Sequence, residues 1–250
     1  MTKALIDGDN IAIACAASAG DDAELWVATS RTNDMLEQIL HAVGATEYEV
    51  WLSGSNNFRY NVYPEYKADR YDAKRPRWEK EVKKYLVDHW QANTSVGCEA
   101  DDMIGVRQMA EIGTIACHLD KDINMIPGRH YNWELSRLGK VVRHAKEYVV
   151  SYEEAIRFFY YQMLIGDPTD HIKGVPGIGP KKAEVILNSC EASEKEYFQV
   201  VREMYGSDEE MEMNGKVLWI WRRMNDIWSI PTYDTTGKQG EGQTIATTST

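Results

Sequence analysis

The chain has 250 residues, 43% of them hydrophobic and 27% charged, so it is long enough to bury a core without disulfides or a structural metal. Its net charge of −11 argues at first against a nucleic-acid partner, yet nine lysines and arginines against five acids lie between Arg59 and Lys84. No apolar run approaches the roughly 18 residues of a membrane span, and Asp7 comes too early for a signal peptide. The four cysteines form no C-x-x-C pair, which predicts reduced thiols in a cytoplasmic protein.

Strands and helices are predicted to alternate in the first half of the chain. Residues 3–7 and 47–52 are short apolar runs bounded by polar residues or glycine, as expected of buried strands. Between them, residues 33–44 have apolar side chains at helical spacing, with an Asn to cap the start and a Gly to end it. A second helix is predicted over about 99–113, followed by a strand over 114–119. This alternation favours an α/β fold with a mainly parallel sheet flanked by helices.

The composition changes in the last part of the chain. Residues 132–144 alternate as in a β-hairpin, and helical periodicity returns over 152–165. From Gly166, a stretch dense in glycine and proline leads into short helical patterns, including a tryptophan-rich one over 217–228. These changes divide the chain into a predicted α/β domain (1–150), a helical module (151–234) and a tail with almost no apolar side chains that is expected to be disordered (235–250).

Acidic residues follow the predicted strands or begin the predicted helices and loops. At the carboxyl edge of a parallel sheet such places converge, so these side chains can share one crevice. They are Asp7 and Asp9; Glu99, Asp101 and Asp102; Asp120 and Asp122; and Asp167 and Asp170. Close carboxylates are electrostatically costly unless cations neutralise them, and an all-oxygen ligand set favours Mg²⁺ or Mn²⁺ over zinc. The set predicts hydrolysis of a phosphate ester by two such ions, whereas any single acid is more simply explained as a helix cap.

The most specific string covers residues 166–183. It is not a Walker loop, because Pro180 stands where lysine is required, and it does not have the third glycine of a dinucleotide fingerprint. Its glycines permit a tight turn that exposes backbone N–H groups at the start of a helix, which suits a phosphate backbone. The residues expected to contact DNA are Gly177, Gly179, Lys181 and Lys182. The alternative is an ordinary turn between two packed helices.

Together these motifs resemble the 5′ nuclease or flap endonuclease family, most closely the 5′-to-3′ exonucleases of bacteriophages. The matching strings are Asp7-Gly8, Glu99-Ala100-Asp101-Asp102, Asp120-Lys121-Asp122 and residues 166–183, within a likeness over about residues 3–190. The resemblance implies a PIN-like nuclease domain, a helix-three-turn-helix motif over about 166–190, two Mg²⁺ ions (or Mn²⁺), and K⁺ as a candidate at that motif. By matching position, the ligands would be Asp7, Glu99, Asp101 and Asp120 for the first ion and Asp122, Asp167 and Asp170 for the second, with Asp102 as a further candidate. The family usually has an aspartate after the second strand, where this chain has Ser53.

Basic and aromatic side chains are interleaved over residues 57–78, a composition that suits single-stranded nucleic acid. The resemblance implies an arch or clamp here, over about 56–90. Its Tyr-Lys-x-x-Arg pattern would bring Tyr66 near the terminal base and Lys67 and Arg70 near the scissile phosphate, and Arg59 is a further candidate DNA contact. The alternative is a solvated charged face with Tyr66 packed inward. The predicted catalytic residues are therefore Lys67, Arg70, Asp7 and Asp120.

We expect, in sum, a Mg²⁺-dependent 5′-to-3′ exonuclease or flap endonuclease that acts as a monomer on DNA with 5′ ends, nicks or flaps, in the host cytoplasm if a phage encodes it. An RNase H-like activity on RNA–DNA hybrids is a further candidate. Two other functions remain open: a PIN-type ribonuclease, which has little use for the glycine-proline turn, and a catalytically silent DNA-structure-binding protein, which the missing carboxylate at Ser53 makes conceivable.

Overall fold

A computed structural model describes residues 1–68, 74–137 and 140–233. Within them, the largest sheet has the strand order β3-β2-β1-β4-β5-β8. Its strands are β1 (Thr2–Asp7), β2 (Ala45–Leu52), β3 (Asn93–Thr94), β4 (Thr114–Cys117), β5 (Gly128–Asn132) and β8 (Lys146–Val150). All neighbouring strands pair in parallel except β5 and β8, which are antiparallel. The prediction of a mainly parallel sheet is confirmed.

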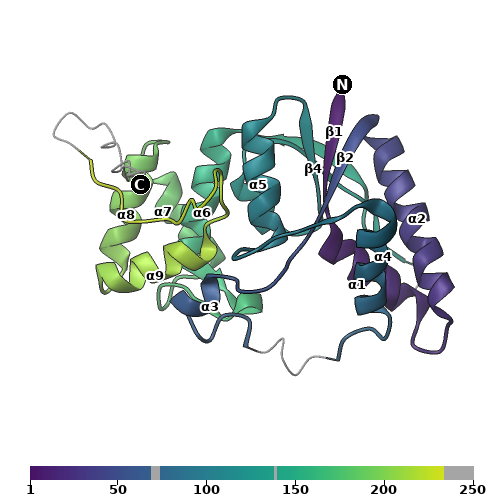
Figure 1. The fold of residues 1–250 in the computed structure, drawn as a ribbon. Coiled ribbons are helices and arrows are strands. Elements are labelled where there is room, and N and C mark those ends of the chain that lie inside the picture. Colours follow the sequence, from purple (N-terminus) through teal and green to yellow (C-terminus); the bar gives the residue numbers. More distant parts are fainter. Residues whose placement is uncertain (69–73, 138–139, 234–250) are drawn as a thin grey trace, which may run out of the picture.

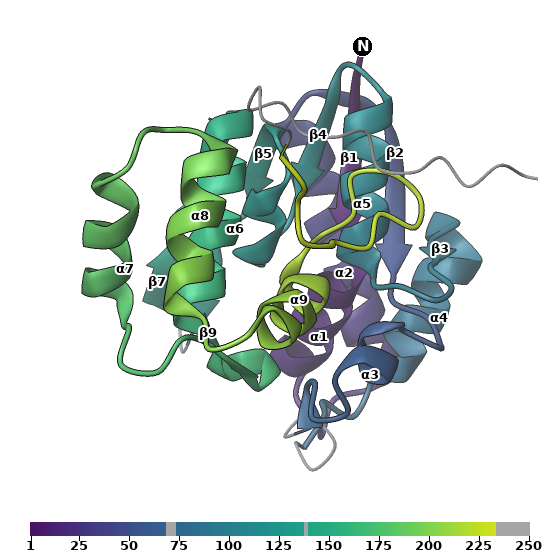
Figure 2. The same ribbon diagram turned by 90° about the vertical axis from the view of Figure 1, so that its left-hand side faces the viewer.

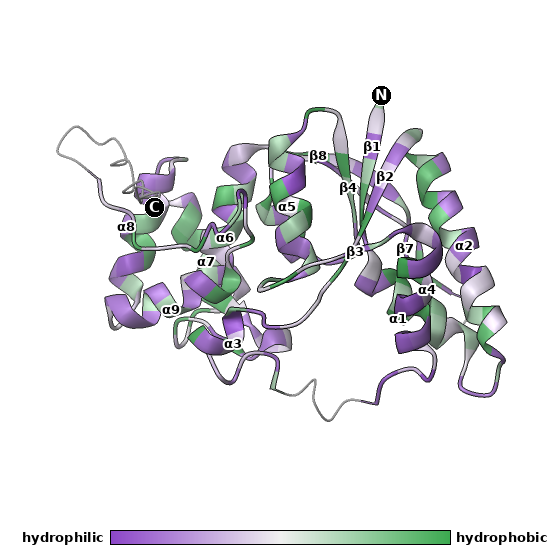
Figure 3. Cartoon of the chain, in the orientation of Figure 1, coloured by the Kyte–Doolittle hydropathy of each residue, from purple (hydrophilic) through white to green (hydrophobic). Residues whose placement is uncertain are grey.

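Helices cover both faces of this sheet (Figure 1). One face packs against α1 (Gly8–Ala19), α2 (Leu25–Ala42) and α4 (Glu79–Trp90), and the other against α5 (Ala100–Ala110). Side chains of β1 alternate accordingly: Ala4 and Ile6 belong to the core under α1 and α2, whereas Leu5 contacts the cluster of Ile104 on α5. In Figure 3, α2 and α4 carry both hydrophobic and hydrophilic residues, as expected for helices that bury one face.

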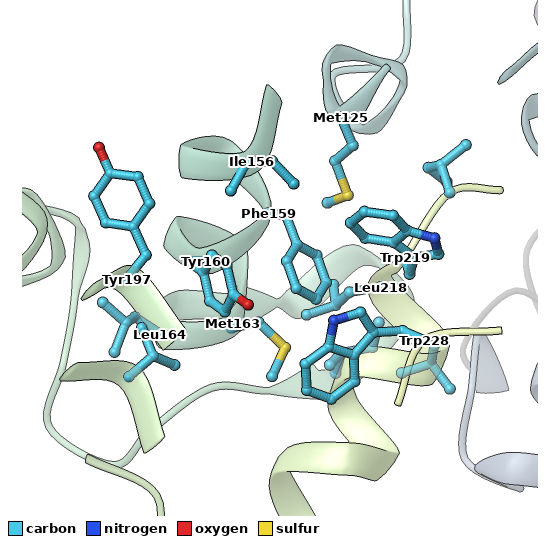
Figure 4. Packing of buried hydrophobic residues seen from close by; sticks show 14 of the residues in the cluster. Met125, Ile156, Phe159, Tyr160, Met163, Leu164, Tyr197, Leu218, Trp219 and Trp228 are labelled. Atoms are coloured by element: carbon cyan, nitrogen blue, oxygen red, sulfur yellow. The ribbon is translucent and has the colours of Figure 1, made fainter. Parts of the chain in front are cut away.

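A second core lies among the C-terminal helices, which Figure 2 shows on one side of the sheet. They are α6 (Tyr152–Ile165), α7 (Pro180–Asn188), α8 (Glu194–Met204) and α9 (Asp208–Leu218). Phe159 of α6 contacts the rings of both Trp219 and Trp228, at centroid distances of 4.9 and 5.6 Å (Figure 4). Gly215 of α9 lies so close to Trp228 that an added Cβ would come within 2.1 Å of its ring. These aromatic contacts bring the last described segment back over α6.

Short elements complete the described chain: α3 (Arg59–Val62), the 3₁₀ turns η2 (Asp122–Met125) and η3 (Pro168–Asp170), and the strand pairs β6 (Leu135–Arg137) with β7 (Lys140–Arg143) and β9 (Gly166–Asp167) with β10 (Ile172–Lys173). The predicted hairpin over 132–144 is confirmed by β6 and β7, and its turn at 138–139 lies outside the described residues. The predicted tail over 235–250 also lies outside them, and the domain boundaries stay predictions. Among the described helices, none has the length and apolarity needed to cross a bilayer.

Two predicted helices differ from the observed ones. Helix α2 begins at Leu25, well before the expected cap Asn33, whose side chain instead bonds with Tyr85 and Trp90 of α4. The tryptophan-rich helix over 217–228 was wrong, because α9 ends at Leu218 and the chain then continues without helix. The carbonyls of Val217 and Trp219 accept hydrogen bonds from the Arg59 side chain, so tertiary contacts take the place of a helix there.

Candidate active site

The predicted acids of the first three segments lie at the carboxyl edge of the sheet. β1 ends at Asp7, whose Oδ1 accepts hydrogen bonds from the N–H groups of Asp9 and Asn10 and so caps α1. β2 and β4 flank β1, so Ser53 and Asp120, which follow them, come to the same edge. A cavity of about 640 Å³ opens there. Its charged lining residues are the acids Asp7, Asp9, Glu99, Asp101 and Asp120 and the cations Lys67, Lys74, Arg75 and Lys83.

The buried acids of this cavity repel one another. Asp7 is 6% exposed, and its burial, followed by the charge of Asp9, raises its pKa to about 7. Burial and then the charge of Glu99 raise the pKa of Asp101 well above its usual value. A protein gains nothing in stability from such a group, so this concentration of carboxylates is evidence for a functional site that binds cations.

Lysine side chains contact several of these acids. Lys67 donates to Glu99 Oε1, and its Nζ lies 3.6 Å from Asp170 Oδ2. Lys83 Nζ of α4 lies 2.7 Å from Asp9 Oδ1. These ammonium groups supply part of the positive charge that the carboxylates require.

A second acidic group adjoins the first. Asp122, at the start of η2, donates its N–H to Asp120 Oδ1 at 2.9 Å. Burial and then the charge of Asp120 raise the pKa of Asp122 to about 7. Lys121 Nζ bridges it to Asp167, at 3.0 Å from Asp122 Oδ1 and 2.8 Å from Asp167 Oδ2. Gln162 of α6 donates to Asp122 Oδ1 at 2.8 Å, so this group joins the sheet to the helical part of the chain.

The four acidic segments that the sequence singled out therefore come together, from the ends of β1 and β4, the start of α5 and the loop after α6. Among the residues that the structure describes, no three His, Cys, Asp or Glu side chains are grouped as ligands of a single ion. The division of the acids between two metal ions thus stays a prediction.

Arg59 and Asp102 do not belong to the cavity, and their predicted roles were wrong. Both side chains are fully buried and pair with each other, at 2.5 Å from Nη1 to Oδ2 and 2.8 Å from Nη2 to Oδ1. A guanidinium buried inside the protein cannot contact a DNA phosphate. The carboxylate oxygens of Asp102 accept hydrogen bonds from Arg59 and from the N–H groups of Glu99 and Trp221. In the structure, Glu99 and Asp102 form a reciprocal capping box at the start of α5, although Glu-x-x-Asp is not the usual sequence signature of one.

Tyr66 is also placed differently from the prediction. It is 2% exposed, and its hydroxyl donates to Glu99 Oε2 at 2.7 Å and lies 3.3 Å from Asp170 Oδ2. The ring therefore offers no surface for a base in this structure, and the alternative of an inward-packed Tyr66 is the observed one. Arg70, the other member of the predicted pattern, lies outside the described residues.

The predicted turn lies between α6 and α7, with Pro180 in the first turn of α7 as expected. Gly177 has a φ of +76°, a conformation that favours glycine, and its carbonyl accepts a hydrogen bond from Lys182 Nζ at 2.8 Å. Gly179, Lys181 and Lys182 are exposed, so the turn is accessible to a ligand. Its contact with DNA stays a prediction.

Two features of the cavity were missed by sequence reasoning. Lys83 belongs to α4, and only the packing of α4 against α1 brings it to Asp9. Ser53 donates its N–H to Asp9 Oδ2 at 2.9 Å, and its Oγ accepts from the N–H of Ala100 at 3.0 Å. The place after β2 therefore has the carboxylate of Asp9 beside it, although residue 53 itself is not acidic.

No protein-family model matches the chain. Among curated proteins, flap endonuclease Xni of Shewanella piezotolerans is 28% identical over 200 residues, which cover 75% of this chain and 76% of the relative. The same enzyme of Shewanella halifaxensis is 26% identical over 195 residues, covering 73% and 75%. Among solved structures, the bacteriophage T5 flap endonuclease in a complex with DNA and metal ions has a TM-score of 0.62 at 19% identity, over 86% of this chain and 87% of that one. The last comparison confirms the PIN-like fold.

Proposed function

We propose that the chain is a member of the 5′ nuclease and flap endonuclease family and hydrolyses phosphodiester bonds near the 5′ ends of DNA, as a 5′-to-3′ exonuclease and flap endonuclease; its likeness to the flap endonucleases Xni supports this. The observation that carries this proposal is the convergence of acids from separate segments on one cavity at the carboxyl edge of the sheet. The proposed substrates are DNA ends, nicks and flaps, with RNA–DNA hybrids as a further candidate, and the proposed active form is a monomer.

Two divalent ions, Mg²⁺ in the first place, are part of the proposal. The donor set fits them, because the acids are carboxylates without interleaved histidine or cysteine. Burial and then neighbouring carboxylates raise the pKa values of Asp7 and Asp122, and a bound cation would favour their ionised forms. When bound, the ions would activate a water molecule and stabilise the leaving oxygen. The proposed ligands are Asp7, Glu99, Asp101 and Asp120 for one ion and Asp122, Asp167 and Asp170 for the other.

Lys67 is the proposed phosphate-contacting cation beside these ligands. Its φ of +55° is rare for a residue with a side chain, and its N–H donates to the carbonyl of Asp170 at 3.0 Å. Such a conformation persists only where surrounding contacts hold it, and these conformations are common in active sites. This supports a fixed ammonium group that stabilises charge on the phosphate during hydrolysis. Arg70 would assist it.

The turn before α7 is the proposed contact with the DNA backbone away from the cleaved bond. Lys181 and Lys182 are exposed at the positive end of α7, an arrangement that suits phosphate and reads no base. A K⁺ ion at this turn is part of the proposal. The turn also argues against a PIN-type ribonuclease, and the retained acids argue against a silent DNA-binding protein.

The test is to incubate the protein with four 5′-labelled substrates: a DNA flap, a blunt DNA duplex, an RNA–DNA hybrid and single-stranded RNA. Each reaction is run with Mg²⁺ and with EDTA. We expect Mg²⁺-dependent cleavage of the flap and release of short products from the duplex. Binding without cleavage would contradict the enzymatic function, and cleavage restricted to RNA would contradict the DNA substrate.

A further inference from the structure

Lys83 lines the active-site cavity from α4. The helix packs against α1 (Figure 1) and is anchored in the core by Val82 and Leu86, both with 0% exposure. The backbone of Lys83, between these two residues, is therefore held in place. Its Nζ lies 2.7 Å from Asp9 Oδ1 and 3.5 Å from Glu79 Oε1. The side chain therefore crosses from α4 to the acids at the end of β1.

Asp9 is held from two sides. Its Oδ2 accepts from the N–H of Ser53, and its Oδ1 faces Lys83. The side chains of Asp9 and Lys83 are 21% and 31% exposed, so their ion pair can open without disturbing the core. Partly exposed pairs of this kind contribute little to stability, and Asp9 Oδ1 is a buried atom with no hydrogen bond of good geometry, so Lys83 holds it by charge alone.

The cations around the cavity form ion pairs with carboxylates in different places. Lys74 pairs with Asp21, on the loop between α1 and α2, and Arg75 pairs with Glu79 of α4. Lys83, in contrast, has its shortest contact with an acid that lies beside Asp7. A cation bound near Asp7 would attract the carboxylate of Asp9 and repel the ammonium group of Lys83, so the pair is poised to separate when the site is filled.

We propose that Lys83 is a phosphate-binding residue of this active site, held by Asp9 until metal ions and DNA bind. The inference rests on the proposed function, since it requires a phosphodiester in the cavity. In the filled site, Asp9 would be available to hold a metal ion, and Lys83 would donate to a phosphate oxygen. Asp9 then provides a carboxylate at the place after β2 where Ser53 provides none.

The first test compares Lys83→Met with Lys84→Met. Lys84 is the next residue on α4, but its side chain is 75% exposed and pairs with Asp88 on the outer side, so it is a matched control. With Mg²⁺, we expect Lys83→Met to raise roughly tenfold the enzyme concentration that gives half-maximal single-turnover cleavage. The slope of log affinity against log salt concentration should fall by about one, because one phosphate contact is lost. Lys84→Met should leave both unchanged, and Lys83→Arg should recover most of the loss because it keeps the charge.

The second test removes the acid that holds Lys83 and needs no catalysis. In EDTA, Asp9→Asn should bind flap DNA several times more tightly than the wild type, because Lys83 is released to the phosphate. The gain should disappear in the Asp9→Asn/Lys83→Met double variant. Without metal, Lys83→Met alone should have little effect on affinity. Thermal melting of each variant checks that it folds.

The two tests separate this inference from the proposed function. If the wild type cleaves no DNA, the proposed function fails, whereas the EDTA measurement still decides whether Asp9 restrains Lys83. The inference is overturned if Asp9→Asn does not increase affinity in EDTA, or if Lys83→Met behaves like Lys84→Met with Mg²⁺.

Discussion

The buried pair of Arg59 and Asp102 joins the two cores, and its removal gives the sharpest test of the structure. In Arg59→Met the carboxylate of Asp102 stays fully buried and keeps only the N–H groups of Glu99 and Trp221 as donors. The carbonyls of Val217 and Trp219 lose their donor as well. Breaking one side of a buried ion pair costs about 3–5 kcal/mol, a large part of the roughly 5–15 kcal/mol that stabilises a typical protein.

The expected result is therefore a loss of about 3–5 kcal/mol in the free energy of unfolding and a fall of about 6–20 °C in Tm. Urea denaturation followed by tryptophan fluorescence measures it, since Trp219 and Trp221 lie beside the pair. The double variant Arg59→Met/Asp102→Leu should lose less than the sum of the single losses, because it leaves no unpaired charge. Arg129→Met is the control: its pair with Glu147 is exposed, so it should change stability by about 1 kcal/mol or less.

The alternative for Arg59 is the DNA contact that the sequence suggested. If Arg59→Met loses less than about 1 kcal/mol in stability, within the range of an exposed pair, the structural reasoning is refuted. A tenfold loss of DNA affinity in the same well-folded variant would then restore the role in binding. A loss of stability with unchanged affinity in the folded fraction supports the buried pair.

Three further changes test separate parts of the molecule. Asp120→Asn should abolish Mg²⁺-dependent cleavage in a single-turnover assay while flap affinity in EDTA stays near that of the wild type; wild-type turnover would remove Asp120 from the site. Gly215→Ala should lower the free energy of unfolding by at least about 1–3 kcal/mol, because the added Cβ would clash with the ring of Trp228. Its control, Gly206→Ala, should be nearly neutral, because no atom lies nearer than 3.9 Å to the added Cβ. Equal effects of the two substitutions would contradict the observed packing. Burial alone would raise the pKa of Glu49, but hydrogen bonds from Arg107 and Lys3 lower this pKa to about 2. The charge of Glu49 therefore stabilises the fold above pH 4.5, and this stabilisation is lost as the pH falls toward 2. Glu49→Gln should therefore cost about 2–3 kcal/mol at pH 7 in urea denaturation and progressively less below pH 4.5, and a difference independent of pH would show that the charge is not responsible.

The sheet and the convergence of the acids could be predicted because both depend on local patterns. Apolar runs that end in Asp7 and just before Asp120 predict strands, and parallel strands bring their carboxyl ends to one edge. The resemblance of the motifs to a known family added the prediction that these acids and the turn before α7 serve the same function. Prediction was correct where short stretches of sequence decide the structure.

Prediction failed where a residue's environment comes from distant parts of the chain. Arg59 lies in a basic, aromatic segment, and no local signal distinguishes a cation buried against Asp102 from one that faces DNA. The tryptophan-rich stretch over 217–228 was predicted to be helical, but its backbone bonds to that same pair. The carbonyl of Trp219 accepts from Arg59, 160 residues away in sequence, and the N–H of Trp221 donates to Asp102, 119 residues away. Lys83 reaches Asp9 only through the packing of helices, 74 positions apart in the chain.

The distribution of charge bears on the proposal that a chain with a net charge of −11 acts on DNA. Its 39 acids exceed its 28 lysines and arginines by eleven, and eight of those acids lie in the two adjoining groups at the edge of the sheet. They are Asp7, Asp9, Glu99, Asp101, Asp120, Asp122, Asp167 and Asp170. Lys67, Lys83 and Lys121 contact these groups, so the other 31 acids face 25 lysines and arginines, an excess of six. Nearly half of the net negative charge therefore lies where the proposed divalent cations would cancel it, so net charge alone is a poor guide to the partner of such a site.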